Sequence, residues 1–254
     1  MAERCRAYFE EAQRLGGLVA KMRLASLAQL TSTEAASVED RPELLELLET
    51  SMVRLRQEFA NGDGTSAGSP VAVQAARAVG EEVRALRRHL ATYVELMTQR
   101  SLFAGDLEAT VRRVTEAATT GIDVERASVW FLDEKRTRIS CADLFERAPR
   151  KHSKGLLLSA EDYAPYFAAL DTERTVAASD ALHDPRTSCF ATHYLAPLGI
   201  TSMLDVPIWV GGKMVGVVCH EHVGKARTWT ADEETFAYLM SNFVALAHER
   251  RRAG

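Results

Sequence analysis

The fold of this chain is decided by residues 201–224, which read TSMLDVPIWVGGKMVGVVCHEHVG. Two runs with strand-like alternation flank the pair Gly211 and Gly212. A tight turn between antiparallel strands needs positive φ angles, which glycine adopts at little steric cost. The stretch therefore predicts a β-hairpin that turns at Gly211-Gly212-Lys213.

A second hairpin precedes it in the chain. Residues 125–133 (ERASVWFLD) and 137–147 (TRISCADLFER) are β-like and are separated by a short polar turn. A helix is expected on either side of the two hairpins. Asp106 is a plausible N-cap for a helix that ends at Gly121. Thr230 and Glu233 have the spacing of a capping box that opens the last helix.

The stretch between the hairpins predicts smaller elements. Residues 159–162 have the pattern of a capping box for a short helix, 174–180 of a short strand, and 183–199 of a turn with short helical turns. Strands and helices in this order predict an α+β fold, with an antiparallel sheet and helices on both faces.

Residues 1–100 differ from the rest, because they have helical periodicity and almost no strand-like alternation. Apolar stripes predict helices over about 3–30, 42–59 and 72–97, and the Gly- and Ser-rich stretch 61–70 predicts a linker. The third stripe keeps a strict heptad spacing. It fits two interpretations, a coiled coil between two chains or a helical bundle within one chain. Its members are Ala72, Ala76, Val79, Val83, Leu86, Leu90, Tyr93 and Met97.

The composition and charge of the chain exclude several classes of protein. The 254 residues are 46% hydrophobic and 26% charged, with a net charge of −4. Neither half is basic, which argues against nucleic acid or a membrane as partner. No apolar run approaches the roughly 18–20 residues of a membrane span, and the first residues do not resemble a secretory signal. The four cysteines are far apart and have no CxxC spacing, so we expect reduced thiols and a cytoplasmic protein.

The sequence from about 102 to 250 resembles the GAF domain family of small-molecule sensors. The resemblance is carried by VERASVWFLDEKRTRISC (124–141), YLAPLGITSMLDVPIWVGGKMVGVVCHEHVG (194–224) and RTWTADEETFAYLMSNFVALAHE (227–249). Together with the change of pattern near residue 100, it predicts two domains, a helical bundle or coiled-coil region over 1–100 and a GAF domain over 101–254. It also implies that the first and last helices cover one face of the sheet, while inserts close a ligand pocket on the other. Terminal helices often build dimers in this family.

The sequence also departs from parts of the family pattern. Only eight residues follow Leu246, so we expect no output domain such as a kinase or cyclase. The motif of the cyclic-nucleotide-binding members is not found. In bilin-attaching members a cysteine lies next to a histidine, whereas Cys189 is followed by Phe190, so no chromophore is expected.

Polar and aromatic residues gather around the implied pocket. Polar side chains inside a sheet domain must pair with each other or face a ligand. The ligand interpretation requires a hollow beneath the inserts. The candidate ligand-binding residues are Tyr163, Phe167, Arg186, Phe190, His193, Tyr194, Asp205, Cys219, His220 and Glu221.

Two alternatives use other chemistry. His220 and His222 share one face of a strand and could bind a metal with Cys189, His193 or His183, although no spacing demands it. Cys141, Cys189 and Cys219 could form a redox site like that of GAF-fold methionine sulfoxide reductases, if they converge. No nucleotide-hydrolase or peptidase motif is present. We therefore expect no catalytic residue, metal or cofactor.

The expected function is that of a non-enzymatic sensor. Its GAF domain would bind a small molecule or mediate dimerisation, and its N-terminal helices would pass the change to a partner. The expected partners are a second copy of the chain and a separate signalling protein such as a kinase or regulator. A thiol- or metal-dependent redox protein is the alternative.

Overall fold

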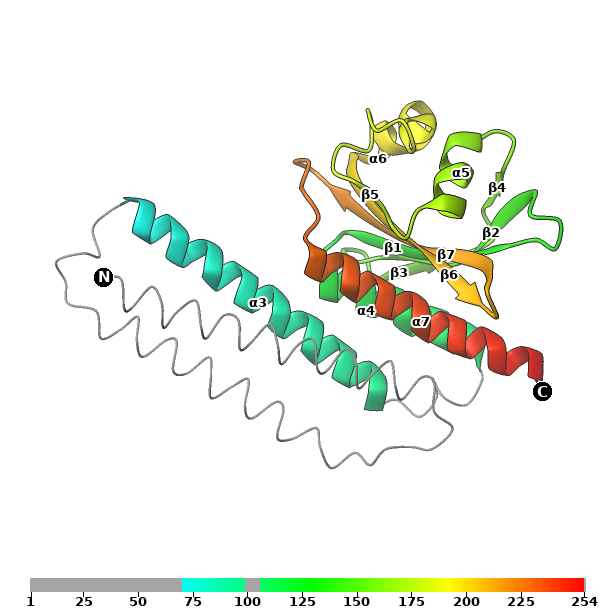
Figure 1. Ribbon diagram of the computed structural model, residues 1–254, viewed down its shortest axis with the longest axis horizontal. Coiled ribbons are helices and arrows are strands. Elements are labelled where there is room, and N and C mark those ends of the chain that lie inside the picture. Colours follow the sequence, from blue (N-terminus) through cyan, green and yellow to red (C-terminus); the bar gives the residue numbers. More distant parts are fainter. Residues whose placement is uncertain (1–69, 99–105, 254) are drawn as a thin grey trace. The chain divides into compact units, whose positions relative to one another are not determined.

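The computed structural model of this chain describes residues 70–98 and 106–253, with side chains for 80–98 and 106–251. The described residues form an antiparallel sheet with helices packed on it (Figure 1), which confirms the expected α+β class.

The sheet has seven strands in the order β3-β2-β1-β7-β6-β5, and β4 pairs with β2 outside this path. Both expected hairpins, β1–β2 and β6–β7, are confirmed, and β1 pairs with β7 to join them. The sequence pattern does not predict β3 and β4. The bounds are β1 Arg126–Leu132, β2 Arg138–Glu146, β3 Lys151–Ser153, β4 Leu157–Ser159, β5 Val176–Ala178, β6 Ile200–Val210 and β7 Lys213–Val223.

The turn of the β6–β7 hairpin is formed as expected. Val210 pairs with Lys213 across it, which leaves Gly211 and Gly212 as the two turn residues. Their φ angles are 55° and 76°. Side chains with a Cβ atom rarely adopt such angles, so the glycine pair fixes the position of the turn and the register of both strands.

Two helices, α4 (Leu107–Ile122) and α7 (Ala231–Ala253), cover one face of the sheet (Figure 1). Both predicted N-termini are confirmed. The backbone N–H of Ala109 donates to Asp106 over 3.0 Å. The backbone N–H of Thr230 donates to Glu233 over 2.9 Å, and that of Glu233 donates back to Thr230 over 3.2 Å. An apolar core lies between these helices and the sheet.

Smaller elements cover the opposite face (Figure 1), namely α5 (Ala164–Thr172), η3 (Ser188–Phe190), the π-helical η4 (Ala191–Leu195) and α6 (Ala196–Leu198). They enclose a second apolar core. The capping box expected at 159–162 is wrong. Ser159 belongs to β4, where it pairs with Arg138, and α5 begins after Tyr163 without a side-chain cap.

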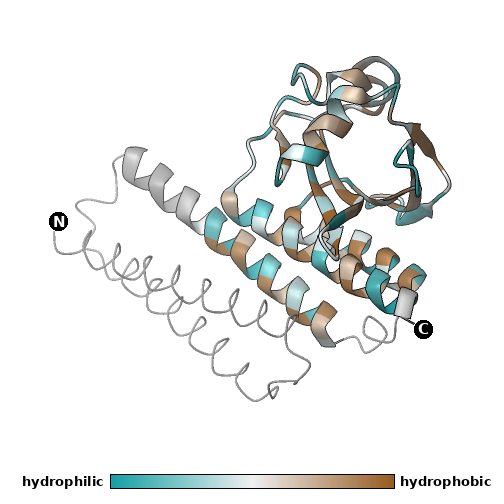
Figure 2. Cartoon of the chain, turned by 45° about the vertical axis from the view of Figure 1, so that its right-hand side comes forward, coloured by the Kyte–Doolittle hydropathy of each residue, from teal (hydrophilic) through white to brown (hydrophobic). Residues whose placement is uncertain are grey.

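Helix α3 (Pro70–Thr98) precedes α4 in the chain, and polar and apolar residues alternate around its described part (Figure 2). The compact unit that contains the sheet begins at Val79, inside α3. Within this unit His89, Thr92 and Leu96 are buried, spaced as one face of a helix. The His89 ring stacks on Phe236 of α7 with 4.7 Å between centroids. The C-terminal half of α3 therefore shares the core of α4 and α7.

Several expectations lie outside the described residues. These are the helices over 3–30 and 42–59, most of the linker at 61–70, and Cys5. They stay predictions from sequence. Among the described helices, none combines the length and the hydropathy that a membrane span requires.

Candidate functional site

The candidate site lies on the face of the sheet beneath α5, η3 and η4. Alternation along β7 directs Cys219 and Glu221 toward this face, and Val218 and His220 toward α4 and α7. The register places Asp205 of β6 beside Cys219, and Arg126 of β1 beside Glu221. Three central strands thus bring ionisable side chains under the inserts.

Arg126 is the centre of a buried ionic network. Its Nε donates to Glu221 over 2.7 Å, its Nη1 to Glu146 over 2.9 Å and its Nη2 to the Tyr194 hydroxyl over 3.3 Å. The Tyr194 hydroxyl in turn donates to Glu221 over 2.7 Å. Arg126 is 9% exposed and Glu221 only 3%. The network therefore ties η4 to the ends of β1, β2 and β7.

The environment of this network favours the charged guanidinium. Burial is the largest single effect and would lower the pKa of Arg126, but Glu221 and Tyr194 together outweigh it and the pKa is raised. Burial raises the pKa of the Tyr194 hydroxyl, and the negative charge of Glu221 adds to the effect. Tyr194 therefore stays a hydrogen-bond donor at neutral pH.

Asp205 forms a second polar group beside the first. The Tyr166 hydroxyl donates to Asp205 Oδ2 over 2.7 Å and lies 3.5 Å from the Cys219 sulfur. Asp205 Oδ1 is buried and accepts no hydrogen bond from the described residues. Burial raises the pKa of Asp205 to about 7, although the Tyr166 hydrogen bond opposes the shift. The site thus holds a buried carboxyl group with one oxygen unused.

Aromatic side chains pack over these polar groups. The rings of Tyr163 and Phe190 stack at 4.5 Å, and Tyr166 meets Phe190 edge-on at 5.0 Å. Tyr166 is 2% exposed, and Leu195 is fully buried. These side chains cover the site and close it off from solvent. A ligand could reach Asp205 only if α5 or η4 moved.

The structure brings seven of the ten predicted residues together on this face. These are Tyr163, Phe167, Phe190, Tyr194, Asp205, Cys219 and Glu221.

Three predicted residues lie elsewhere. His220 is fully buried on the opposite face, where its Nδ1 donates to the Leu204 carbonyl over 2.7 Å. Burial lowers the pKa of His220 to about 4, so the ring is neutral. His193 is exposed. Arg186 pairs with Asp184 over 2.6 Å and with Glu173 over 2.5 Å, and forms no ion pair with Asp205 or Glu221.

Sequence reasoning missed Arg126, Glu146 and Tyr166. Arg126 left a usable signal, because it opens a strand whose next residues, Ala127 to Trp130, are all apolar or small. A charged side chain in such a strand needs a buried partner. That partner, Glu221, is 95 positions away, so its identity was not visible.

The alternatives from metal and thiol chemistry find little support. Within residues 70–98 and 106–253 there is no group of three or more His, Cys, Asp or Glu side chains that could hold a metal ion. Cys141, Cys189 and Cys219 are free thiols. Burial raises the pKa of Cys141 to about 12, and also raises those of Cys189 and Cys219. Thiolates are the reactive form, so these thiols are poorly suited to attack.

Comparison with known proteins gives a consistent result. The sequence model of the GAF domain matches residues 106–248. The fold is similar to the phycoerythrobilin-bound GAF domain of a cyanobacterial phytochrome, at 17% identity and a TM-score of 0.54, covering 65% of this chain and 96% of that one. Residues 122 to 287 of a methyl-accepting chemotaxis protein match at 17% identity and a TM-score of 0.52, covering 64% and 97%.

A third solved structure is the GAF domain of an Acinetobacter phosphoenolpyruvate-protein phosphotransferase. It matches at 16% identity and a TM-score of 0.51, covering 66% of this chain and 95% of that chain. No curated protein is significantly similar to the sequence.

Proposed function

This chain belongs to the GAF domain family, and from that premise we propose that it is a non-enzymatic signal-transduction protein. Its site beneath α5 and η4 binds a small polar molecule, and α3 passes the change to a separate signalling partner. The phytochrome and chemotaxis origins of two similar domains agree with a role in signalling. The compartment we propose is the cytoplasm.

The observation that carries the proposal is the unused oxygen of Asp205. A buried acceptor without a donor costs about 1–3 kcal/mol, and such groups in folded proteins call for an explanation. A ligand that forms a hydrogen bond with Oδ1 supplies one, as an acceptor when the carboxyl group is protonated and as a donor when it is ionised. The neighbouring Tyr166 hydroxyl and the Arg126–Glu221 pair offer further polar partners to the same molecule.

The lid over this site has the features of a movable element. Helix η4 is π-helical, a geometry that is rare and often found at functional sites. Tyr194 on η4 contacts the sheet through hydrogen bonds with Arg126 and Glu221, and it also packs against the apolar core. A ligand that competes for these contacts would release η4, which shifts the population from a closed to an open form.

The central strands connect the site to α3. Cys219 and Glu221 face the inserts, while Val218, between them in the sequence, packs in the core under α4 and α7. Leu96 of α3 is buried in that same core. A change at the site therefore reaches α3 through one strand and one apolar layer. We propose that the chain works as a homodimer, in which this helix region contacts the second copy.

The test uses the full chain. Native mass spectrometry reports any small molecule that travels with the protein, and thermal unfolding with a panel of small polar metabolites finds others. We expect a ligand that raises Tm in the wild type and in the exposed control Asp162→Asn. Asp205→Asn should bind it at least about tenfold more weakly. If no compound binds, or if Asp205→Asn binds as the wild type does, the chain is a scaffold that acts through its helices alone.

A further inference from the structure

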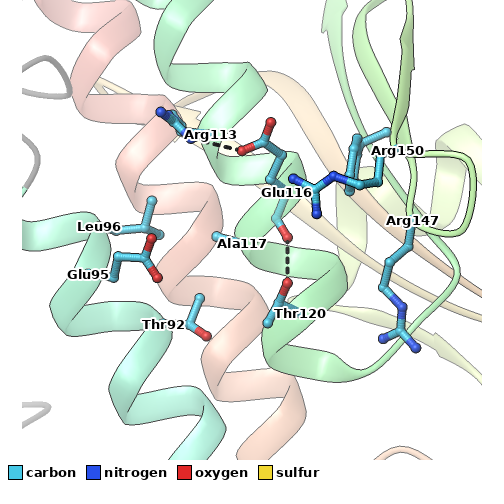
Figure 3. Close-up of a pocket in the computed structure, with 10 residues that line it drawn as sticks. Thr92, Glu95, Leu96, Arg113, Glu116, Ala117, Thr120, Arg147 and Arg150 are labelled. Carbon is cyan, nitrogen blue, oxygen red and sulfur yellow. Dashed lines mark hydrogen bonds and ion pairs between the residues drawn. The ribbon is translucent and has the colours of Figure 1, made fainter.

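A second cavity lies on the helix-covered side of the domain. It has a volume of about 230 Å³ and is formed by the last turns of α3, by α4 and by the turn after β2 (Figure 3). This is smaller than the roughly 300–1,000 Å³ of sites for drug-sized molecules. Its occupant must therefore be small.

The charged groups around this cavity are largely paired with each other. Arg113 pairs with Glu116 over 3.1 Å, and the other oxygen of Glu116 contacts His152 over 3.1 Å. Arg147 pairs with Asp123 over 2.6 Å. Most of the charged side chains around the cavity are therefore already in ion pairs.

Two charged side chains remain without an ion pair to any described residue. Arg150 reaches toward α4 from the turn after β2, and Glu95 projects from α3 on the other side (Figure 3). One cation and one carboxylate thus lie on separate walls of one small cavity.

The mixture of charges argues for a particular class of ligand. Three guanidinium groups disfavour a simple cation, because like charges repel at close range. The carboxylates of Glu95 and Glu116 disfavour a multiply charged anion for the same reason. A molecule with one negative and one positive end can form an ion pair with both Arg150 and Glu95.

We propose that this cavity binds a small zwitterion of the free amino-acid type. Its carboxylate accepts hydrogen bonds from Arg150, a geometry in which guanidinium can donate twice. Its ammonium donates to Glu95. Because the two partners belong to the sheet domain and to α3, the ligand bridges them and holds α3 against the domain. This site is separate from the one beneath α5 and η4, and its occupancy would tune the same helix.

The test compares L-alanine with its two truncated analogues on the full chain. Propionate lacks the ammonium group, and ethylamine lacks the carboxylate. Saturation-transfer NMR and calorimetry are suited to the weak binding expected of an exposed site. We expect L-alanine to bind in the millimolar range or better, and each analogue to bind at least about tenfold more weakly than L-alanine.

Variants locate the binding site. Arg150→Gln and Glu95→Gln should each weaken amino-acid binding at least about tenfold, since each removes one charged hydrogen bond. Both residues are exposed, so neither change should affect folding. The exposed turn residues Lys135 and Glu134 provide matched controls, Lys135→Gln and Glu134→Gln, which should bind as the wild type does.

Three results would overturn the proposal. In the first, no amino acid binds up to about 10 mM. In the second, propionate or inorganic phosphate binds as tightly as L-alanine, which indicates a plain anion site. In the third, binding survives Arg150→Gln and is lost in Asp205→Asn. That pattern places the ligand beneath α5 and η4, and supports the proposed function instead.

Discussion

Asp205 makes the stability of this protein depend on pH in an unusual direction. Its pKa is raised to about 7 in the folded chain, from an ordinary value of 3.8. Between these values the folded state holds a proton that the unfolded state has lost, so this contribution to stability is complete below about pH 4 and is lost as pH rises to about 7.

Asp205→Asn removes this dependence, because the amide does not titrate. Relative to the wild type, the variant should gain stability as pH rises from about 4 to about 7, at about 1.4 kcal/mol for each unit of pKa difference at most. Urea unfolding of both proteins across this range measures the difference. Parallel stability curves would mean that the pKa of Asp205 is ordinary.

Arg126 is the residue whose loss should be most costly. Arg126→Ala leaves Glu221 buried at 3% exposure without its cation. Removing one partner of a buried ion pair costs about 3–5 kcal/mol. Urea unfolding should show this loss. Arg138→Ala is the control, because Arg138 is 61% exposed and pairs with Asp133 over 3.4 Å, so its change should cost less than about 1 kcal/mol. Equal effects would mean that the network adds nothing.

At the scale of single residues, the alternation of side chains between the two faces of a strand was the most informative signal in the sequence. It separates Cys219 and Glu221 from His220 and His222, and in the structure Cys219 and Glu221 lie beneath the inserts while His220 lies on the opposite face. The same alternation should have excluded His220 from the candidate ligand-binding residues. The partner of Arg126 could not be found this way, because a contact over 95 positions depends on the order of strands and not on local pattern.

At the scale of elements, local signals worked where the local chain decides the structure. The capping box of Thr230 and Glu233 forms with both reciprocal hydrogen bonds. The similar pattern at Ser159 fails, because Leu157 to Ser159 pair with β2 instead. Strand pairing with a distant segment overrides a cap that contributes about 1 kcal/mol. For the same reason the short strands β3 and β4 have no clear sequence signature.

Gly121 controls how closely α4 approaches α7. A Cβ atom at this position would lie 2.3 Å from the ring of Phe236, which is buried. Gly121→Ala should therefore destabilise the protein by about 1–3 kcal/mol, although alanine favours helices. Gly80→Ala in α3 is the matched control. Its Cβ would be 3.6 Å from the nearest atom, so we expect no loss.

Urea unfolding at one pH compares the two glycine variants. Adding Phe236→Leu to Gly121→Ala should recover part of the lost stability, because the smaller side chain leaves room for the methyl group. A Gly121→Ala protein as stable as the wild type would mean that α4 and α7 are not in close contact at this point.

At the scale of the whole molecule, α3 presents two adjacent stripes. One contains His89, Thr92 and Leu96, which are buried in the unit that begins at Val79. The other is the heptad stripe, in which Tyr93 and Met97 pack against the same core, whereas Leu86 and Leu90 are half-buried. Sequence periodicity identified the heptad stripe, because its members are apolar. It missed the other stripe, because histidine and threonine give no apolar signal.

The heptad stripe leads to the last prediction, which concerns the assembly. We expect the full chain to be a homodimer in which Leu86 and Leu90 contact the second copy, because a heptad stripe left half-buried can be covered by the same stripe of the second copy.

The double variant Leu86→Glu and Leu90→Glu places charges in that contact and should give a monomer in native mass spectrometry. Arg87→Glu changes an exposed position on the same helix and should stay dimeric. Near-UV circular dichroism should be unchanged in both variants, since the buried stripe is not altered. A wild-type chain that is monomeric, or a double variant that remains dimeric, would place the partner of this stripe within the same chain.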